Sequence, residues 1–177
     1  MILKKINAIL SLVTTILLLT HAISVALWML SQGSIVIHER FSVSFILIIT
    51  VVLHALVSIA LMILAHAGEK RQKGRAYPRM NLPTIVQRIS GVLLILFTWL
   101  HIAGAMGFMT PPQVVHAIVP PLFFIIVMAH IAVSTSKAFI TLGVGNAKFI
   151  KGVDISTKAI CVITLVADIV GFYLYVC

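Results

Sequence analysis

The sequence predicts an all-α integral membrane protein, a bundle of five transmembrane helices. Two observations carry this prediction: 61% of the 177 residues are hydrophobic, and only 10% are charged. Soluble domains have about a quarter charged residues, so this chain has too few polar groups to cover a water-facing surface. Its length allows a single membrane domain over residues 1–177 and leaves no room for a separate soluble domain.

Five apolar stretches are long enough to cross the hydrocarbon core, which takes about 20 helical residues. They cover residues 6–30, 42–66, 89–109, 114–136 and 155–176. The first follows Lys4 and Lys5 and is longer than the apolar part of a signal peptide, so we expect a retained span. The connectors between the stretches contain glycine, proline and basic residues, which mark breaks between helices.

The thirteen lysines and arginines predict the orientation of the bundle. If the N-terminus is cytoplasmic, twelve of them lie on the cytoplasmic side and only Arg40 lies outside. This bias follows the positive-inside rule and places the C-terminus outside. We therefore expect a multi-pass protein of the bacterial cytoplasmic (inner) membrane, with anionic lipid at its basic connectors. The net charge of +9 does not indicate nucleic-acid binding, because basic nucleic-acid-binding proteins are not this apolar.

Four histidines lie inside the apolar stretches, one on each of the first four. They are His21, His54, His101 and His130. A polar side chain in hydrocarbon is costly and usually faces a cavity, a neighbouring helix or a cofactor. A lone histidine in such a place more often hydrogen-bonds a neighbouring helix. One on each of four consecutive spans favours a shared role as ligands.

The depth of the histidines sorts them into two pairs. With a rise of 1.5 Å per residue, His21 and His101 lie about 16 Å from the outer ends of their helices, and His54 and His130 about 24 Å. Low-spin haem iron takes two neutral imidazoles on opposite sides of the porphyrin. The pattern therefore predicts two haem b groups, an outer one bound by His21 and His101 and an inner one bound by His54 and His130. His116 is an alternative to His101, since a spacing of fourteen residues puts it on the same helix face as His130.

Other uses of the same residues are less consistent with the pattern. A structural zinc ion needs four ligands at one point, which the difference in depth opposes. Cys161 and Cys177 lie far apart and outside any CxxC motif, which excludes thiolate zinc sites and covalent haem attachment. A haem-free, proton-coupled transporter would use the histidines as relay groups, usually with acidic partners. The first four spans contain no acid, which is less typical of such a relay. The transporter therefore stays the alternative to a haem protein.

Several further side chains are candidates for supporting roles. Arg88 and Lys137 lie near the cytoplasmic ends of their spans and could bind the haem propionates, although Arg88 serves equally well as a lipid-facing anchor. Gly91 allows either close approach of a porphyrin or ordinary helix packing. Asp168 is the only acid inside a span. It suits proton exchange at the outer side or a place at the headgroup level, and Glu39 in the outer connector suits the same proton role.

The sequence of the third span resembles that of a helix in a known protein family. The stretch Gln87-Arg88-Ile89-Ser90-Gly91, followed by Trp99-Leu100-His101, is similar to the third membrane helix of the di-haem cytochrome b anchor of succinate:quinone and quinol:fumarate oxidoreductases. Leu53-His54-Ala55 resembles the ligand site of the second helix. The order of one ligand on each of the first four of five helices is also similar and covers residues 20–140.

The resemblance implies a membrane subunit docked to a flavoprotein and an iron–sulfur protein on the cytoplasmic side. It implies a proximal haem on His54 and His130, a distal haem on His21 and His101, and electron transfer between iron–sulfur clusters and a quinone. The dicarboxylate chemistry would belong to the flavoprotein, so this chain would contribute no catalytic residue and would be part of an enzyme only as its membrane subunit. The chain departs from the family in its short outer loops and in Met128-Ala129, where some members have a proton-transferring glutamate. Another quinone-linked oxidoreductase with a di-haem anchor is an alternative within the same class.

Overall fold

The computed structural model describes residues 2–34, 40–71, 82–105, 108 and 113–176. Nearly all of these residues are helical. The helices are α1 (Ile2–Leu30), α2 (Arg40–Arg71), α3 (Leu82–Ala105), α4 (Gln113–Leu142) and α5 (Ala147–Val176). All five are long and apolar enough to cross a membrane. The predicted fold class and the number of spans are confirmed: this is the architecture of a multi-pass membrane protein.

The helices differ from the predicted stretches mainly at the end of the bundle that holds the N-terminus, where each is longer than its apolar run. A helix satisfies its own backbone groups and can therefore continue beyond the hydrocarbon. Pro83, which the sequence placed in a connector, lies in the first turn of α3, where its missing N–H is not needed. Gly152, also placed in a connector, lies inside α5.

The connector between α4 and α5 is short, and both helix ends that flank it are capped. Gly143 ends α4 with a φ of 75°, a conformation that glycine adopts without steric cost. The amide of Val144 then donates to the carbonyl of Phe139 at 3.1 Å. At the start of α5, Asn146 Oδ1 accepts a hydrogen bond from the amide of Phe149 at 3.0 Å.

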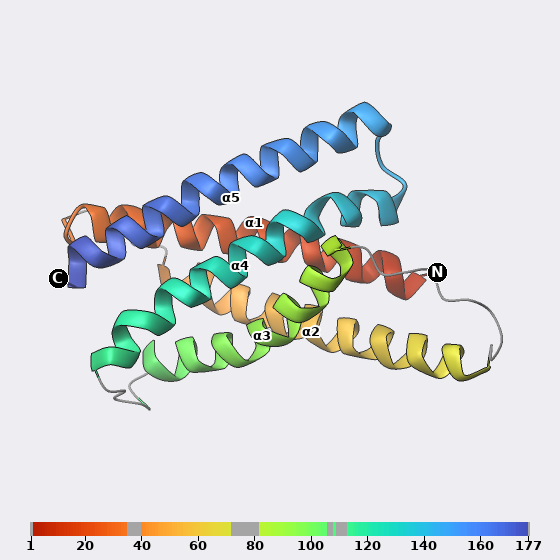
Figure 1. Ribbon diagram of the computed structural model, residues 1–177, viewed down its shortest axis with the longest axis horizontal. Coiled ribbons are helices and arrows are strands. Elements are labelled where there is room, and N and C mark those ends of the chain that lie inside the picture. Colours follow the sequence, from red (N-terminus) through yellow and green to blue (C-terminus); the bar gives the residue numbers. More distant parts are fainter. Residues whose placement is uncertain (1, 35–39, 72–81, 106–107, 109–112, 177) are drawn as a thin grey trace.

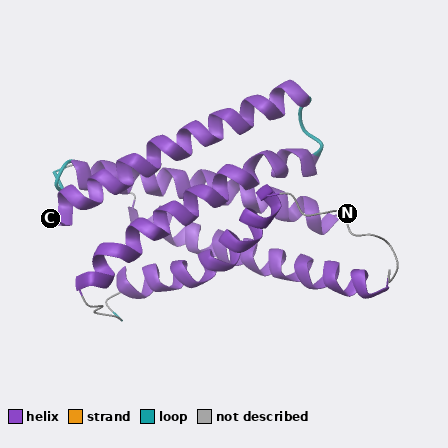
Figure 2. Cartoon of the chain, viewed as in Figure 1, coloured by secondary structure: helices purple, strands orange, loops and turns teal. Residues whose placement is uncertain are grey.

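Two helices, α1 and α4, form the centre of the bundle. Helix α1 packs on α2, α4 and α5, and α4 packs on α1, α3 and α5. In the described part of the chain α2 and α3 make no extensive contact with each other. Successive helices run in opposite directions, so the N- and C-termini lie at opposite ends (Figure 1), and the described connectors lie at the two ends of the bundle (Figure 2).

Burial is uneven around this centre. Buried residues make up 39% of the span in α4 and 33% in α5, against 11% in α1, 6% in α2 and 11% in α3. A buried cluster of Val127, Met128, Ile131 and Cys161 joins α4 to α5, with Leu18 and Ala22 of α1 packed against it. The tightest packing therefore lies on the α1–α4–α5 side, and α2 and α3 form a less buried side.

Candidate functional site

The four predicted histidines lie on four different helices and form two pairs. His21 on α1 is within electrostatic range of His101 on α3, and His54 on α2 is within range of His130 on α4. These are the pairs that depth along the helices predicts. Neither α1 and α3 nor α2 and α4 pack extensively on each other over the described residues. His101 is exposed, and the other three histidines are partly buried.

His130 is held against α3 by a hydrogen bond and by close contact. Its Nδ1 lies 2.9 Å from Ser90 Oγ, and Ser90 Oγ in turn donates to the carbonyl oxygen of Val86 at 2.6 Å. A Cβ built on Gly91 would lie 3.3 Å from His130 Cε1, which is tighter than ordinary side-chain contact. Gly91 thus serves the close approach of an imidazole to the α3 backbone.

His54 occupies a different environment on α2. Its Nδ1 is buried and finds no hydrogen-bond partner in the described part of the chain. One turn further along, Ser58 donates to Asn7 Oδ1 of α1 at 3.0 Å, so this face of α2 is turned toward the first helix. The backbone of Asn7 on α1 also lies beside the His54 ring and interacts with it, so α1 helps to hold this imidazole.

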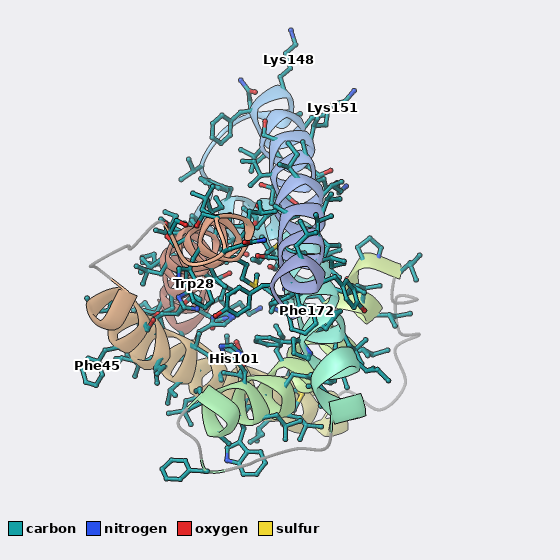
Figure 3. All side chains as sticks on the ribbon, turned by 90° about the vertical axis from the view of Figure 1, so that its left-hand side faces the viewer. Trp28, Phe45, His101, Lys148, Lys151 and Phe172 are labelled. Atoms are coloured by element: carbon teal, nitrogen blue, oxygen red, sulfur yellow. The ribbon has the colours of Figure 1, made fainter. Side chains whose placement is uncertain are left out.

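The outer histidines contact α2 and α4. His21 Nδ1 lies 3.4 Å from Ser44 Oγ of α2, near the upper limit for a hydrogen bond. The His101 ring stacks on Phe123 of α4, with centroids 5.2 Å apart and planes inclined by 29°. Viewed along the bundle, His101 extends from α3 toward the interior, on the side where Trp28 and Phe172 lie (Figure 3).

Basic side chains lie toward the end of the bundle that carries the N-terminus. Lys137 Nζ on α4 donates to Gln87 Oε1 at 2.8 Å and to Thr84 Oγ1 at 3.3 Å, both on α3. It is also within electrostatic range of His130, two helical turns away. Arg88, next to Gln87, is exposed on the surface. The structure thus brings Lys137 toward the inner histidine pair and leaves Arg88 on the outside of α3.

Asp168 is buried in the packed side of the bundle. It is 1% exposed, and neither carboxyl oxygen finds a hydrogen-bond partner among the described residues. One turn further along α5, Gly171 packs against Ala26 and Met29 of α1, and Phe172 contacts Phe124 of α4. Asp168 therefore lies between α1, α4 and α5, and the surrounding helices cover its side chain.

Two candidates cannot be placed. Glu39 lies outside the described residues, and so does the side chain of His116 in the first turn of α4. Within the described part of the chain no three His, Cys, Asp or Glu side chains converge on a point that could hold a metal ion. The histidine groupings there are pairs, which suits a cofactor with two axial ligands rather than a cluster-bound ion.

Comparison with known proteins finds no match: no family model, no curated protein and no solved structure is similar to this chain. The site must therefore be interpreted from its own chemistry. Paired neutral imidazoles in an apolar bundle can bind a metalloporphyrin or relay protons.

Sequence reasoning missed the side chains that hold the histidines. Ser90 and Phe123 contact His130 and His101 from a neighbouring helix, and Gln87 binds Lys137. Ser90 stands in the Gln87–Gly91 stretch that carries the resemblance, but nothing in that stretch indicates its contact with His130. Phe123 gave no signal, because aromatic residues are common throughout the spans.

Proposed function

We propose that this chain is a di-haem b-type cytochrome that anchors a quinone-linked oxidoreductase in the membrane, with a succinate dehydrogenase or fumarate reductase as the complex. The observation that carries the proposal is the pairing of four intramembrane histidines across four helices at two levels. Haem, when bound, supplies a one-electron redox centre at each level, as transfer between an iron–sulfur protein and a membrane quinone requires.

The residues present fit haem b. Each pair offers two imidazoles, one from each of two helices. The ring of His130 is oriented by Ser90, in the way that metal-binding histidines usually are oriented by a hydrogen bond at the other nitrogen. His54 Nδ1 is buried, and the ring lies beside the backbone of Asn7 on α1, which holds it at the α1–α2 contact. Lys137 lies near the inner pair, where a cation would stabilise a propionate.

The chain's own residues would perform three tasks. The histidines of α1–α4 would hold the two haems, one pair for each. The apolar side chains of the spans exclude water and lower the local dielectric, which favours neutral ligands over charged ones. Lys137, tethered by Gln87 and Thr84, would orient the inner group from the side that faces the partner subunits.

We place the partners, a flavoprotein and an iron–sulfur protein, on the cytoplasmic side. The support is the charge distribution, in which the N-terminal end of the bundle carries Lys4, Lys5, Lys148 and Lys151 on described helices. This end would face the cytoplasm of a bacterial inner membrane under the positive-inside rule. Asp168 would exchange protons with a quinone on the opposite side, because it lies nearer to the outer end of α5.

The buried carboxyl of Asp168 also favours a second candidate, a haem-free proton-coupled transporter. Intramembrane acids are rare, usually face the bundle interior and often belong to proton relays, and Asp168 is an acid buried in the described bundle. A visible absorption spectrum distinguishes the two candidate functions, because only the cytochrome is coloured.

The test is haem content in the purified, membrane-inserted protein. We expect a dithionite-reduced minus oxidised spectrum of a b-type cytochrome and two haems per chain. His→Ala substitution at His21, His54, His101 or His130 should each lower the count to about one, because a haem with one axial imidazole is weakly held. His116→Ala is the matched control and should retain two. A colourless wild-type protein that takes up no added haemin would exclude the cytochrome and favour the transporter.

A further inference from the structure

We propose that Ser90 is a positioning residue that fixes His130 as the Nδ1-protonated tautomer, leaving Nε2, on the opposite side of the ring, as the ligand atom of the inner pair. The hydrogen bond and the tautomer follow from the geometry at α3. The assignment of Nε2 as an iron ligand rests on the proposed function.

The direction of the hydrogen bond follows from counting hydrogens. The Ser90 hydroxyl carries one hydrogen, and the carbonyl oxygen of Val86 is its nearest acceptor at 2.6 Å, with the carbonyl of Gln87 further away at 3.3 Å. Once this hydrogen is donated to the backbone, Ser90 Oγ has only lone pairs left. A distance of 2.9 Å between Ser90 Oγ and His130 Nδ1 then requires the proton to be on the imidazole.

A second acceptor supports the same tautomer. The backbone carbonyl of Gln87 also lies beside the His130 ring. With Nδ1 unprotonated, a nitrogen lone pair would face two oxygens without any shared hydrogen, which is unfavourable in a low-dielectric interior. The Nδ1-protonated form satisfies this side of the ring and directs the free lone pair of Nε2 away from Ser90.

Gly91 allows the His130 ring to lie close to the α3 backbone. The His130 ring lies so close to α3 that a Cβ at Gly91 would contact Cε1 at 3.3 Å and Nδ1 at 3.8 Å. Turning the ring over would exchange Nδ1 for a carbon at Ser90 and lose the hydrogen bond. Ser90 fixes the orientation of the His130 ring through the hydrogen bond, and Gly91 leaves the space that the ring occupies.

The consequence is a difference between the two sites. Donation from Nδ1–H to an acceptor makes the imidazole more basic and a stronger iron ligand, which favours the ferric state and lowers the reduction potential. The His101 ring makes no hydrogen bond in the described part of the chain and is instead stacked on Phe123. Loss of the Ser90 hydroxyl should therefore change the inner site and leave the outer site unaltered.

The variants are Ser90→Ala, which removes the hydroxyl, and Ser90→Thr, which keeps it. Ser134→Ala is the matched control, because Ser134 is also buried and its hydroxyl donates to the backbone carbonyl of His130 at 2.6 Å rather than to the ring. Haemin binding to the haem-free protein and potentiometric titration of each haem are measured for all three.

We expect Ser90→Ala to bind the inner haem about 10–100-fold more weakly and to raise its midpoint potential, with the outer haem unchanged. Ser90→Thr should restore both properties, and Ser134→Ala should match the wild type. An unchanged inner potential in Ser90→Ala, or an equal shift in Ser134→Ala, would overturn the positioning role.

A haem-free measurement separates this inference from the proposed function. In protein labelled with 15N-histidine, the resonances missing from His130→Ala identify His130, and their chemical shifts report its tautomer. We expect the Nδ1-protonated form in the wild type and its loss in Ser90→Ala. A wild-type His130 protonated on Nε2 would overturn the inference, whether or not haem binds. A wild type that shows the Nδ1-protonated form and binds no haem would leave the inference standing and end the proposed function.

Discussion

The two sides of the bundle hold their helices together in different ways. On the packed side, the buried hydroxyls of α4 bond within their own helix, as Ser134 does to the carbonyl of His130 and Thr135 to that of Ile131. On the less buried side, polar groups bond between helices, as in the contacts of Ser58 with Asn7 and of Lys137 with Gln87. Close packing joins α4 and α5, with one long contact of 3.4 Å between Ser136 Oγ and Asp154 Oδ1, whereas α2 and α3 are positioned mainly by polar contacts with α1 and α4.

The contrast follows from the physics of a bilayer. Lipid tails are as apolar as leucine side chains, so burial of apolar surface does not drive helices together, and dense packing or polar contacts must do so. Helices α4 and α5 have dense packing, with 39% and 33% of their spans buried, and α2 has only 6%. If two haems bind between α1, α2, α3 and α4, their faces would supply the contacts that fix α2 and α3.

The largest effect expected from this comparison concerns haem removal. In the proposed cytochrome, loss of haem should reduce the protection of α2 and α3 backbone amides against hydrogen exchange by at least about tenfold, which corresponds to about 1.4 kcal/mol. The amides of α5 should keep their protection, because α5 carries no ligand and packs on α1 and α4. Hydrogen exchange with mass spectrometry, on matched haem-loaded and haem-free samples, measures both. Equal loss in α5 would show that the two sides are one cooperative unit.

A smaller effect is expected at Asp168, which tests whether the packed side is purely structural. Replacing this unpartnered buried carboxyl with an apolar side chain should leave the stability equal or higher, by up to about 1–2 kcal/mol. If Asp168 exchanges protons with quinone, Asp168→Leu should lower quinone-linked turnover of the assembled complex by about 10²-fold or more, with both haems retained. Asp168→Glu keeps the carboxyl and should recover part of the rate. Full turnover in Asp168→Leu would assign Asp168 to packing alone.

The smallest effect is expected from two glycines of α5. A Cβ on Gly171 would lie 3.2 Å from Met29 Cβ and 3.4 Å from the Ala26 carbonyl oxygen, whereas one on Gly152 would meet nothing within 4 Å. We expect Gly171→Ala to destabilise the α1–α5 contact by about 1 kcal/mol and Gly152→Ala to stabilise the helix by about 0.5–1 kcal/mol. Unfolding in mixed detergent micelles compares the two. Similar changes with the same sign would contradict tight packing at Gly171.

The sequence was sufficient for the fold class because the apolar length of a span is set by the thickness of the hydrocarbon. It was not sufficient for the helix ends. Hydropathy marks where the hydrocarbon stops, whereas helical hydrogen bonding continues to a cap, as at Gly143 and Asn146. The predicted start of α5 at residue 155 therefore lies eight residues after the observed start at Ala147.

For the candidate site, the sequence indicated which histidines share a level, because depth along a helix follows from counting residues. It could not indicate which faces of two helices meet. The contact of Ser90 with His130 and the burial of Asp168 both depend on the rotation of one helix against another. That rotation is set by packing over many residues and leaves no local pattern in the chain.

The contact of Gly171 with Ala26 and Met29 has a consequence for biosynthesis. It makes the first and the last helices neighbours, so the face of α1 that receives α5 stays covered by lipid or by the insertion machinery while the three intervening helices are made. The α1–α5 contact can therefore form only after α5 has been synthesised, and a chain interrupted before Ala147 would leave this face of α1 without its partner helix.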